Sequence, residues 1–354
     1  MNRGGILVNI KHMHYLLSFF GAAILALGLT PLAMALSVKY KVFDRPGLRK
    51  VHQKEMPCLG GAALAATFFI CLWLARGLWP QVFETMDRKL LALTLGGLMI
   101  FSVGLYDDLR DASVSVRFLV QFAAAGVLIW GGFLITMLPN PQGGRLDLGL
   151  LSYPFTALWI VFLINALNFI DGLDGLAAGI SAIVALTIFF VAEQTGQPLV
   201  ALASILMLGS LLGFLPFNFH PARIFLGDSG ATLIGFLFAA MTTLGTMKSV
   251  AAISLLLPIA ALGVPIFDTV KAVLRRTRRG QKFYQADKEH IHHLLLSAGF
   301  SHQGAVMFLY GCTFFLSVLS IMAASADRRL ISILAVIIII LVGVFFKKWQ
   351  KNRE

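Results

Sequence analysis

The chain has 354 residues, of which 58% are hydrophobic and only 13% are charged, and its mean hydropathy is +0.83. Soluble domains carry nearer ~25% charged residues, so this composition excludes an ordinary soluble protein and indicates an integral membrane protein. The net charge of +12 must then lie on the loops, facing anionic lipid headgroups, an anionic substrate or both. The three cysteines, Cys58, Cys71 and Cys312, are too scattered to indicate a disulfide framework or a metal cluster.

Apolar segments long enough to cross a bilayer, about 20 residues each, recur along the whole chain. We predict about eleven such spans, near 14–37, 59–76, 88–106, 116–138, 153–170, 176–192, 199–217, 230–247, 250–272, 304–325 and 329–347. The first is too long, and too poor in a small-residue cleavage site, to be a signal peptide. The predicted fold is an all-α polytopic membrane protein in which residues 1–354 form a single domain.

Basic residues gather in the loops on one side of these spans. If the N-terminus lies outside, that side comprises the C-terminal tail and the loops 39–57, 107–115, 171–175, 218–229 and 273–303. The positive-inside rule makes this side cytoplasmic, with the C-terminus also in the cytoplasm. Most Asp and His residues fall on the same side. We therefore predict a functional site at the cytoplasmic mouth, with 273–303 as a basic, histidine-containing cytoplasmic loop.

The first acidic stretch, Asp107-Asp108-Leu-Arg-Asp111, closes the third predicted span. On a helix Asp107 and Asp111 share one face and Asp108 lies beside Asp111. Their like charges repel each other, and a cation or a phosphate-bound Mg²⁺ would relieve that repulsion. The alternative is a solvated helix end with Arg110 and Arg117 as charge partners.

A second polar stretch, Asn165-Ala-Leu-Asn168-Phe-Ile-Asp171-Gly-Leu-Asp174-Gly175, separates two apolar runs. Its polar residues recur every three positions, so successive members lie ~60° apart on a helix and the set drifts by roughly 180°. One straight helix cannot aim them all at one ligand, but Gly172 and Gly175 allow a break. Alone, the stretch is equally typical of a turn built from two Asp-Gly pairs.

A third stretch, Phe225-Leu-Gly-Asp-Ser-Gly230, lies just before another predicted span. Gly227 permits close backbone approach, Asp228 can ligate a hard cation, and Ser229 can cap the following helix. The helix start would also favour a phosphate. A plain N-cap turn explains the same residues.

The cytoplasmic loops add basic and imidazole side chains. Arg275-Arg-Thr-Arg-Arg279 precedes His290-Ile-His292-His293, and the first loop carries Lys50 and His52. The histidines lack the cysteine or carboxylate that would complete a zinc site, so contacts with phosphate and sugar hydroxyls suit them better. A patch on anionic lipid is the alternative for the arginines, and a solvated loop for Lys50 and His52.

In this order, the motifs resemble the polyprenyl-phosphate N-acetylhexosamine-1-phosphate transferase family, from Asp44 to about Phe300. The family's acidic pattern matches Asp107, Asp108 and Asp111. Its Asn-x-x-Asn-x-x-Asp-Gly-x-Asp-Gly signature matches Asn165, Asn168, Asp171 and Asp174, and its Phe-x-Gly-Asp-x-Gly motif matches Phe225, Gly227, Asp228 and Gly230.

The resemblance implies transfer of a sugar-1-phosphate from a UDP-sugar to undecaprenyl phosphate, with release of UMP, in the bacterial cytoplasmic membrane. It implies a need for Mg²⁺, with Mn²⁺ as an alternative, held by Asp228 and Asn168. Asp107 or Asp108 would activate or orient the lipid phosphate, Asp171 and Asp174 would help hold the uridine diphosphate and the metal, and Phe225 would stack on uracil. The other expected substrate contacts are Lys50, His52, Asp111, Asn165, Arg275, His290, His292 and His293.

The motifs indicate the type of reaction more specifically than they indicate which UDP-sugar is the donor. Arg275-Arg-x-x-x-Gly280 and the interrupted triplet His290-Ile-His292-His293 are similar to the branch that uses UDP-N-acetylglucosamine. The muramoyl-pentapeptide branch has a contiguous triplet. Lys282-Phe-Tyr284, where the N-acetylglucosamine branch often has Ser-Pro-Phe, and Arg117, where several relatives have Lys, keep another UDP-N-acetylhexosamine or UDP-MurNAc-pentapeptide open.

Other functions account for less of the sequence. A secondary transporter would use intramembrane carboxylates, but such groups lie near the midplane, whereas these cluster at one face. An aromatic-acceptor prenyltransferase leaves Phe225–Gly230 and the histidine loop unexplained. A CDP-alcohol phosphotransferase would need an arginine soon after Asp171-Gly172. We expect no nucleic-acid partner; a homodimer stays open.

Overall fold

The computed structural model describes residues 3–44, 55–84, 86–139, 145–245, 262–278 and 290–324. Within these ranges the protein has eleven α-helices, together with short 3₁₀ helices η1 (Pro80–Phe83) and η2 (Gly149–Leu151). The helices are α1 (Arg3–Tyr40), α2 (Gly60–Leu78), α3 (Asp87–Arg110), α4 (Val114–Trp130), α5 (Ser152–Ile170), α6 (Leu176–Gln194), α7 (Pro198–Asn218), α8 (Gly227–Gly245), α10 (Gly263–Arg278), α11 (Ile291–Ser297) and α12 (His302–Ala324).

Two short antiparallel hairpins interrupt this helical architecture. Strands β1 (Phe43–Asp44) and β2 (Met56–Pro57) pair with Phe43 opposite Pro57. Strands β3 (Met137–Pro139) and β4 (Arg145–Asp147) pair with Met137 opposite Asp147. The predicted helical fold is confirmed, and the hairpins are small additions in its loops.

Seven of the described helices are long and apolar enough to cross a membrane. These segments are Met13–Tyr40, Gly60–Leu78, Asp87–Arg110, Gly149–Ile170, Leu176–Gln194, Pro198–Asn218 and His302–Ile321. The protein is therefore a multi-pass membrane protein, as its composition predicts. Helix α4 is apolar but shorter, the predicted span 329–347 lies outside the described residues, and only the end of 250–272 falls within them.

The predicted span 116–138 was wrong at its C-terminal end. Helix α4 begins at Val114 and stops at Trp130, where Gly131 and Gly132 follow. Gly132 adopts φ +90°, a left-handed conformation that only glycine adopts readily, and it terminates the helix. The chain then leads into β3 instead of continuing as a helix.

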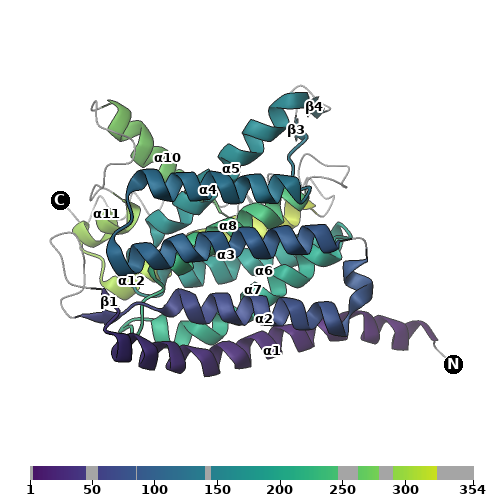
Figure 1. Cartoon of the computed structure of the whole chain (residues 1–354), viewed down its shortest axis with the longest axis horizontal. Coiled ribbons are helices and arrows are strands. Elements are labelled where there is room, and N and C mark those ends of the chain that lie inside the picture. Colours follow the sequence, from purple (N-terminus) through teal and green to yellow (C-terminus); the bar gives the residue numbers. More distant parts are fainter. Residues whose placement is uncertain are drawn as a thin grey trace, which may run out of the picture.

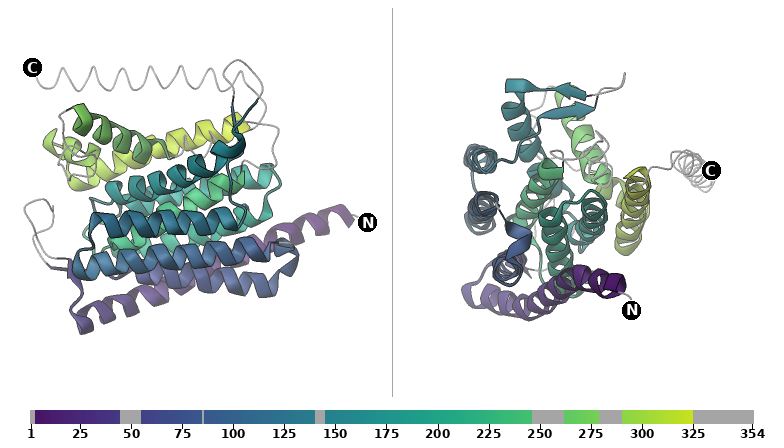
Figure 2. Two further views of the ribbon diagram at one scale, coloured as in Figure 1. Left: turned by 45° about the horizontal axis from the view of Figure 1, so that its top comes forward. Right: turned by 90° about the vertical axis from the view of Figure 1, so that its right-hand side faces the viewer.

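Most of the helices run side by side along one direction, which α5 and α10 cross obliquely, and the end-on view separates an inner from an outer set (Figures 1 and 2). Helices α6, α7 and α8 are the most deeply buried, and α8 is enclosed by α3 and α5. Helix α1 packs along α7 where a Cβ on Gly209 or Gly213 would lie 2.4 or 2.3 Å from backbone oxygens of α1. Small residues thus let these two backbones approach closely, as in other membrane helix pairs.

One end of the bundle collects the polar motifs. The end of α3, the α5–α6 turn, the end of α7, the start of α8, α11 and the start of α12 all lie at the left-hand end in Figure 1, opposite the N-terminus. The first turn of α8 is tightly enclosed there. A Cβ on Gly61 would lie 2.3 Å from the backbone nitrogen of Gly230, and one on Gly104 would lie 2.5 Å from Cα of Ser229.

Candidate active site

The first turn of α8 is held by a carboxylate from α3. Asp108 Oδ1 accepts a hydrogen bond from the backbone N–H of Asp228 (2.7 Å), and its Oδ2 accepts one from that of Ser229 (3.1 Å). Helix starts leave such donors unpaired, so Asp108 caps α8 from a distant part of the chain. The prediction that Ser229 caps this helix was wrong, because Ser229 already lies inside the first turn.

Asp228 connects three of the sequence motifs. Its Oδ1 accepts a hydrogen bond from Nδ2 of Asn168 on α5 (2.7 Å), and its carboxyl group also contacts that of Asp107 on α3. Asp107 in turn accepts hydrogen bonds from Nη1 of Arg117 (2.7 Å) and the backbone N–H of Ala112 (2.7 Å). The pairing with Arg117 that the sequence offered as an alternative is thus present, but beside other carboxylates.

Asp171 adds a fourth carboxylate immediately after α5. Burial, followed by the negative charges of Asp228 and Asp108, raises the pKa of Asp171 to about 8. A carboxyl group among like charges favours its neutral form, and a bound cation would reverse that preference. We name Asp107, Asp108, Asn168, Asp171 and Asp228 the acidic cluster. Its donors are all oxygen atoms, the ligands that Mg²⁺ prefers.

Asp174 is engaged by a different set of residues. Its Oδ2 lies 2.7 Å from Nδ1 of His220 and accepts a hydrogen bond from the backbone N–H of Ala222 (3.1 Å). Its own backbone N–H donates to Nε2 of His302 (3.0 Å), and the two imidazole rings stack with centroids 4.2 Å apart. Donor atoms of Asp174, His220 and His302 lie within 4.8 Å of one another, so geometry alone would allow them to hold a metal ion. Two imidazoles and one carboxylate suit a transition metal better than Mg²⁺.

The histidine motif is anchored by a buried carboxylate on α10. Asp268 Oδ2 lies 2.7 Å from Nδ1 of His290, and its Oδ1 accepts a hydrogen bond from the backbone N–H of Ile291 (2.8 Å). Nη2 of buried Arg276 lies 3.5 Å from Nε2 of the same histidine, and the guanidinium group stacks over Phe169. His290 is therefore fixed by protein groups on both ring nitrogens.

His292 lies against the turn that carries the second motif. A Cβ on Gly172 would lie 2.2 Å from Nε2 of His292, so only glycine permits this packing. Burial, followed by the charges of His293 and His290, lowers the pKa of His292 to about 3. A neutral imidazole can accept as well as donate a hydrogen bond, and its buried Nδ1 has no hydrogen-bond partner in the described structure.

The remaining predicted site residues occupy varied positions. Asn165 lies inside α5, where its Nδ2 donates to Oε1 of buried Gln121 (2.8 Å). Half-buried Phe225 has its backbone fixed by Pro57 and Gly60 just before α8. Asp111 is the exposed C-cap of α3. His293 is half-buried beside His292, and Arg275 is half-buried on α10 next to buried Arg276. Lys50 and His52 lie outside the described residues.

Sequence reasoning did not select several residues that complete these contacts. They are Gln121, His220, Asp268, Arg276 and His302. A signal existed for Gln121 and Asp268, because polar groups within apolar segments are costly unless they are paired or functional. Arg276 was missed beside Arg275, although adjacent helical residues point about 100° apart and only one could face the core.

The convergence of these motifs agrees with comparisons to known proteins. Residues 90–246 match the family described as glycosyl transferase family 4. The chain is 37% identical to a probable undecaprenyl-phosphate N-acetylglucosaminyl 1-phosphate transferase of Bacillus subtilis (strain 168), covering 94% of this chain and 92% of the relative. This chain belongs to glycosyl transferase family 4.

Two further relatives support this assignment. A decaprenyl-phosphate N-acetylglucosaminephosphotransferase of Mycolicibacterium smegmatis is 36% identical, with 82% of this chain and 77% of the relative covered. An undecaprenyl-phosphate alpha-N-acetylglucosaminyl 1-phosphate transferase of Escherichia coli (strain K12) is 30% identical, with 78% and 75% covered. The matches span the acidic cluster and most of the bundle, so the family resemblance predicted from the motifs is confirmed.

Proposed function

We propose that this protein is an enzyme that transfers N-acetylglucosamine-1-phosphate from UDP-N-acetylglucosamine to undecaprenyl phosphate, releasing UMP. The product would be the first lipid-linked intermediate of a cell-envelope polysaccharide. The observation that carries the proposal is the acidic cluster, in which three separate motifs converge on Asp228 within hydrogen-bonding distance. The names of the relatives supply the donor and acceptor classes.

The acidic cluster fits a hard divalent cation. Asp228 and Asn168 would hold Mg²⁺, with Asp171 able to contribute, because their donors are oxygen atoms and their charges otherwise repel. When bound, the ion would neutralise the charge of the donor diphosphate. The protein's own part is positioning: Asp108 fixes the first turn of α8, and Arg117 orients the carboxylate of Asp107.

This arrangement suits phosphoryl transfer. Such reactions ask little covalent chemistry of the protein and depend on alignment and charge stabilisation. Asp107 and Asp108 lie on the last turn of α3, where one of them would orient the lipid phosphate. Phe225 would stack on uracil, and Asp171 and Asp174 would contact the diphosphate end of the donor. His292 and His293 are placed beside the Asp171–Gly175 turn, within reach of a ligand held there.

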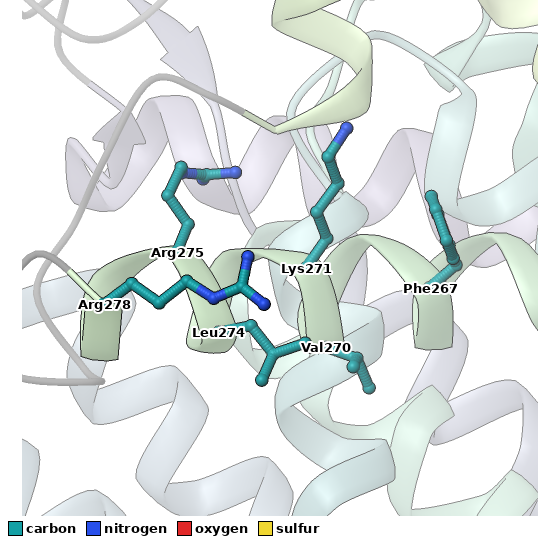
Figure 3. A pocket seen from close by; sticks show the side chains of 6 residues that line it. All are labelled: Phe267, Val270, Lys271, Leu274, Arg275 and Arg278. Atoms are coloured by element: carbon teal, nitrogen blue, oxygen red, sulfur yellow. The ribbon is translucent and has the colours of Figure 1, made fainter.

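An exposed face of α10 supports a phosphorylated lipid as the acceptor. Its apolar residues are Phe267, Val270 and Leu274, and its basic residues are Lys271, Arg275 and Arg278. Figure 3 shows all six along a groove of about 470 Å³ on this one helix. Apolar side chains beside cations suit a molecule with a hydrocarbon chain and a phosphate, and also suit anionic headgroups of the surrounding bilayer.

The proposed orientation places the acidic cluster at the cytoplasmic face of the bacterial cytoplasmic membrane, within a single domain of about eleven spans. Two observations support it: basic residues are concentrated in the loops at this end of the bundle, and UDP-sugars are soluble cytoplasmic molecules. Labelling of single-cysteine variants in intact cells with a membrane-impermeant maleimide tests it. Asp147→Cys should be labelled from outside, and Asp111→Cys only after permeabilisation.

The decisive experiment supplies purified protein with undecaprenyl phosphate, Mg²⁺ and a panel of UDP-sugars, and measures UMP. We expect release with UDP-N-acetylglucosamine and at least ~10-fold less with UDP-MurNAc-pentapeptide. A preference for another UDP-N-acetylhexosamine would change the sugar and leave the reaction class intact. No UMP with any donor, together with substrate uptake into liposomes, would instead support the transporter.

A further inference from the structure

We infer that His220 and His302 are positioning residues that clamp the Asp171–Gly175 turn through Asp174, and so hold Asp171 at the acidic cluster. The inference rests on the proposed function for its catalytic meaning and on geometry for its structural content. Neither histidine belongs to the motifs that define the site. They come from segments far apart in sequence, one after α7 and one at the start of α12.

Three hydrogen-bonding contacts hold Asp174 in this clamp. Nδ1 of His220 and the backbone N–H of Ala222 share Oδ2 of Asp174, while Nε2 of His302 accepts the Asp174 backbone N–H. The imidazole rings stack at 4.2 Å with an interplanar angle of 21°, so each restricts the other. Nε2 of Gln303 donates to the backbone carbonyl of His220 (3.4 Å), which ties the two segments together.

Helix α12 holds the same turn at a further point. The Tyr310 hydroxyl group donates a hydrogen bond to the backbone carbonyl of Gly175, and its ring fills the space beside Gly179. The segment from Asp171 to Gly175 therefore depends on α12 for its position, although α12 contributes no residue to the acidic cluster. Sequence motifs could not reveal this dependence, because Asp174 and His302 are 128 residues apart.

The turn needs such external support. It connects α5 to α6 through Gly172 and Gly175, and Gly175 adopts φ +76°. Glycine lowers the cost of that conformation but also leaves the segment many alternatives. Asp171 lies three residues before Asp174, beside the carboxyl groups of Asp228 and Asp108. Without the clamp, the turn could take other conformations that move Asp171 away from these groups, and displacements of about 1 Å can cost ~10²-fold in rate.

Two other roles for these histidines predict different behaviour. A transition-metal site would take one ligand atom from each of Asp174, His220 and His302, yet Nδ1 of His220 and Nε2 of His302 are already engaged by Asp174. Direct proton transfer to substrate would require the imidazole ring itself. A clamp requires only one donor at the Nδ1 position of residue 220 and one acceptor at the Nε2 position of residue 302.

The amides of Asn and Gln can replace those two ring atoms separately. Asn places a donor where Nδ1 of histidine lies, and Gln places an acceptor near Nε2. We therefore compare His220→Ala with His220→Asn and His302→Ala with His302→Gln in purified full-length protein. The readouts are UMP release, with kcat and KM separated, and the affinity for Mn²⁺ measured by electron paramagnetic resonance.

The alanine variants should lose ~10–100-fold in kcat and ~3–10-fold in Mn²⁺ affinity, whereas His220→Asn and His302→Gln should stay within about 3-fold of wild type. The alanine double variant should be little worse than either single variant, because both histidines support one turn. If an alanine variant does not fold, Tyr310→Phe, which removes only the bond to Gly175, should show a smaller loss in the same direction.

Several results would overturn the clamp. One is equal impairment of the amide and alanine variants, and another is unchanged turnover and Mn²⁺ affinity in both alanine variants. Stoichiometric Zn²⁺ binding by the wild type, lost in His302→Ala, would indicate a metal site instead. Absence of UMP from the wild type would remove the proposed function, while the Mn²⁺ affinities would still decide whether the clamp exists.

Discussion

The carboxylates on the two sides of this site have opposite kinds of neighbours. In the acidic cluster, carboxylates face one another, and Arg117 is the only cation that the described contacts place against them. We call the other group of contacts the histidine side. There, Asp174 pairs with His220, and Asp268 pairs with His290, whose other ring nitrogen lies beside Arg276. The first arrangement is unfavourable until a cation binds, whereas in the second each carboxylate already has a hydrogen-bond partner in the protein.

This contrast distinguishes residues that bind ligands from residues that stabilise the fold. Like charges held together destabilise the folded state, and proteins keep them mainly where a ligand relieves the repulsion. Paired buried charges instead become costly when one partner is removed. Substitutions on the acidic side should therefore act mainly on turnover, and substitutions on the histidine side should act first on stability.

Asp228→Ala should give the largest change in activity. It removes the carboxylate on which the three motifs converge, so turnover should fall by more than ~10³-fold while the folded protein persists. UMP release at several Mg²⁺ concentrations measures this. Asp147→Asn is the matched control, because exposed Asp147 lies in the distant hairpin, where its side chain accepts a hydrogen bond from Gly149. A variant with the Mg²⁺ dependence of the wild type would contradict the ligand role of Asp228.

Asp268→Ala should give the largest change in stability. It leaves buried His290 and the N–H of Ile291 without their acceptor, beside the guanidinium group of Arg276. Loss of one partner from such a group costs about 3 kcal/mol or more, so the thermal unfolding temperature in detergent should fall clearly. Activity at low temperature should fall less than in Asp228→Ala. If Asp268→Ala unfolds like the wild type, the distinction between the two sides is wrong.

Asp171→Asn sharpens the comparison in the opposite direction. The amide cannot ionise, so folding without a divalent cation no longer has to protonate this carboxyl group or hold its charge beside Asp228 and Asp108, and the variant should unfold at a higher temperature than the wild type. Added Mg²⁺ should stabilise the variant less than the wild type, because stabilisation by a ligand grows with its affinity for the folded state. Thermal unfolding in EDTA and in Mg²⁺ measures both effects. A lower unfolding temperature in EDTA would show that Asp171 is structural.

The difference between the two sides also explains what the sequence could predict. The acidic cluster comes from short motifs whose residues are close in sequence, such as Asp107 with Asp108 or Asn168 with Asp171, and their chemistry is readable from spacing. Apolar run lengths predicted most helices in the same way. The break after α5 was predictable because Gly172 and Gly175 mark it.

The histidine side depends on contacts between distant segments, which no spacing encodes. His220 and His302 meet across Asp174, and Asp268 meets His290 across the stretch between α10 and α11. Their roles arise from packing, since α12 must lie against α6 before Tyr310 can reach Gly175. The capping of α8 by Asp108 is a similar case, and it replaced the local cap expected from Ser229.

Substitution of Arg117, the cation beside the acidic cluster, should give the smallest effect. It tests whether this arginine neutralises the carboxylates or positions them. Its pair with Asp107 joins a carboxylate that is 7% exposed to a guanidinium group that is 36% exposed, through a single Nη1–Oδ2 contact of 2.7 Å. Partly exposed pairs contribute about 0–1 kcal/mol, so Arg117→Ala should barely alter the unfolding temperature.

Arg117→Ala should instead change the net charge of the acidic cluster, and with it the affinity for a cation. Without Arg117, the carboxylate of Asp107 is uncompensated, so the cluster should bind Mn²⁺ ~2–5-fold more tightly while turnover falls by a similar factor. Arg117→Lys should restore both values, because the contact uses one donor and lysine retains the charge. Weaker Mn²⁺ binding in Arg117→Ala would mean that the arginine shapes the site more than it neutralises it. Asp107 would then resemble Asp174 and Asp268, which are paired within the protein, and not the carboxylates that bind a cation.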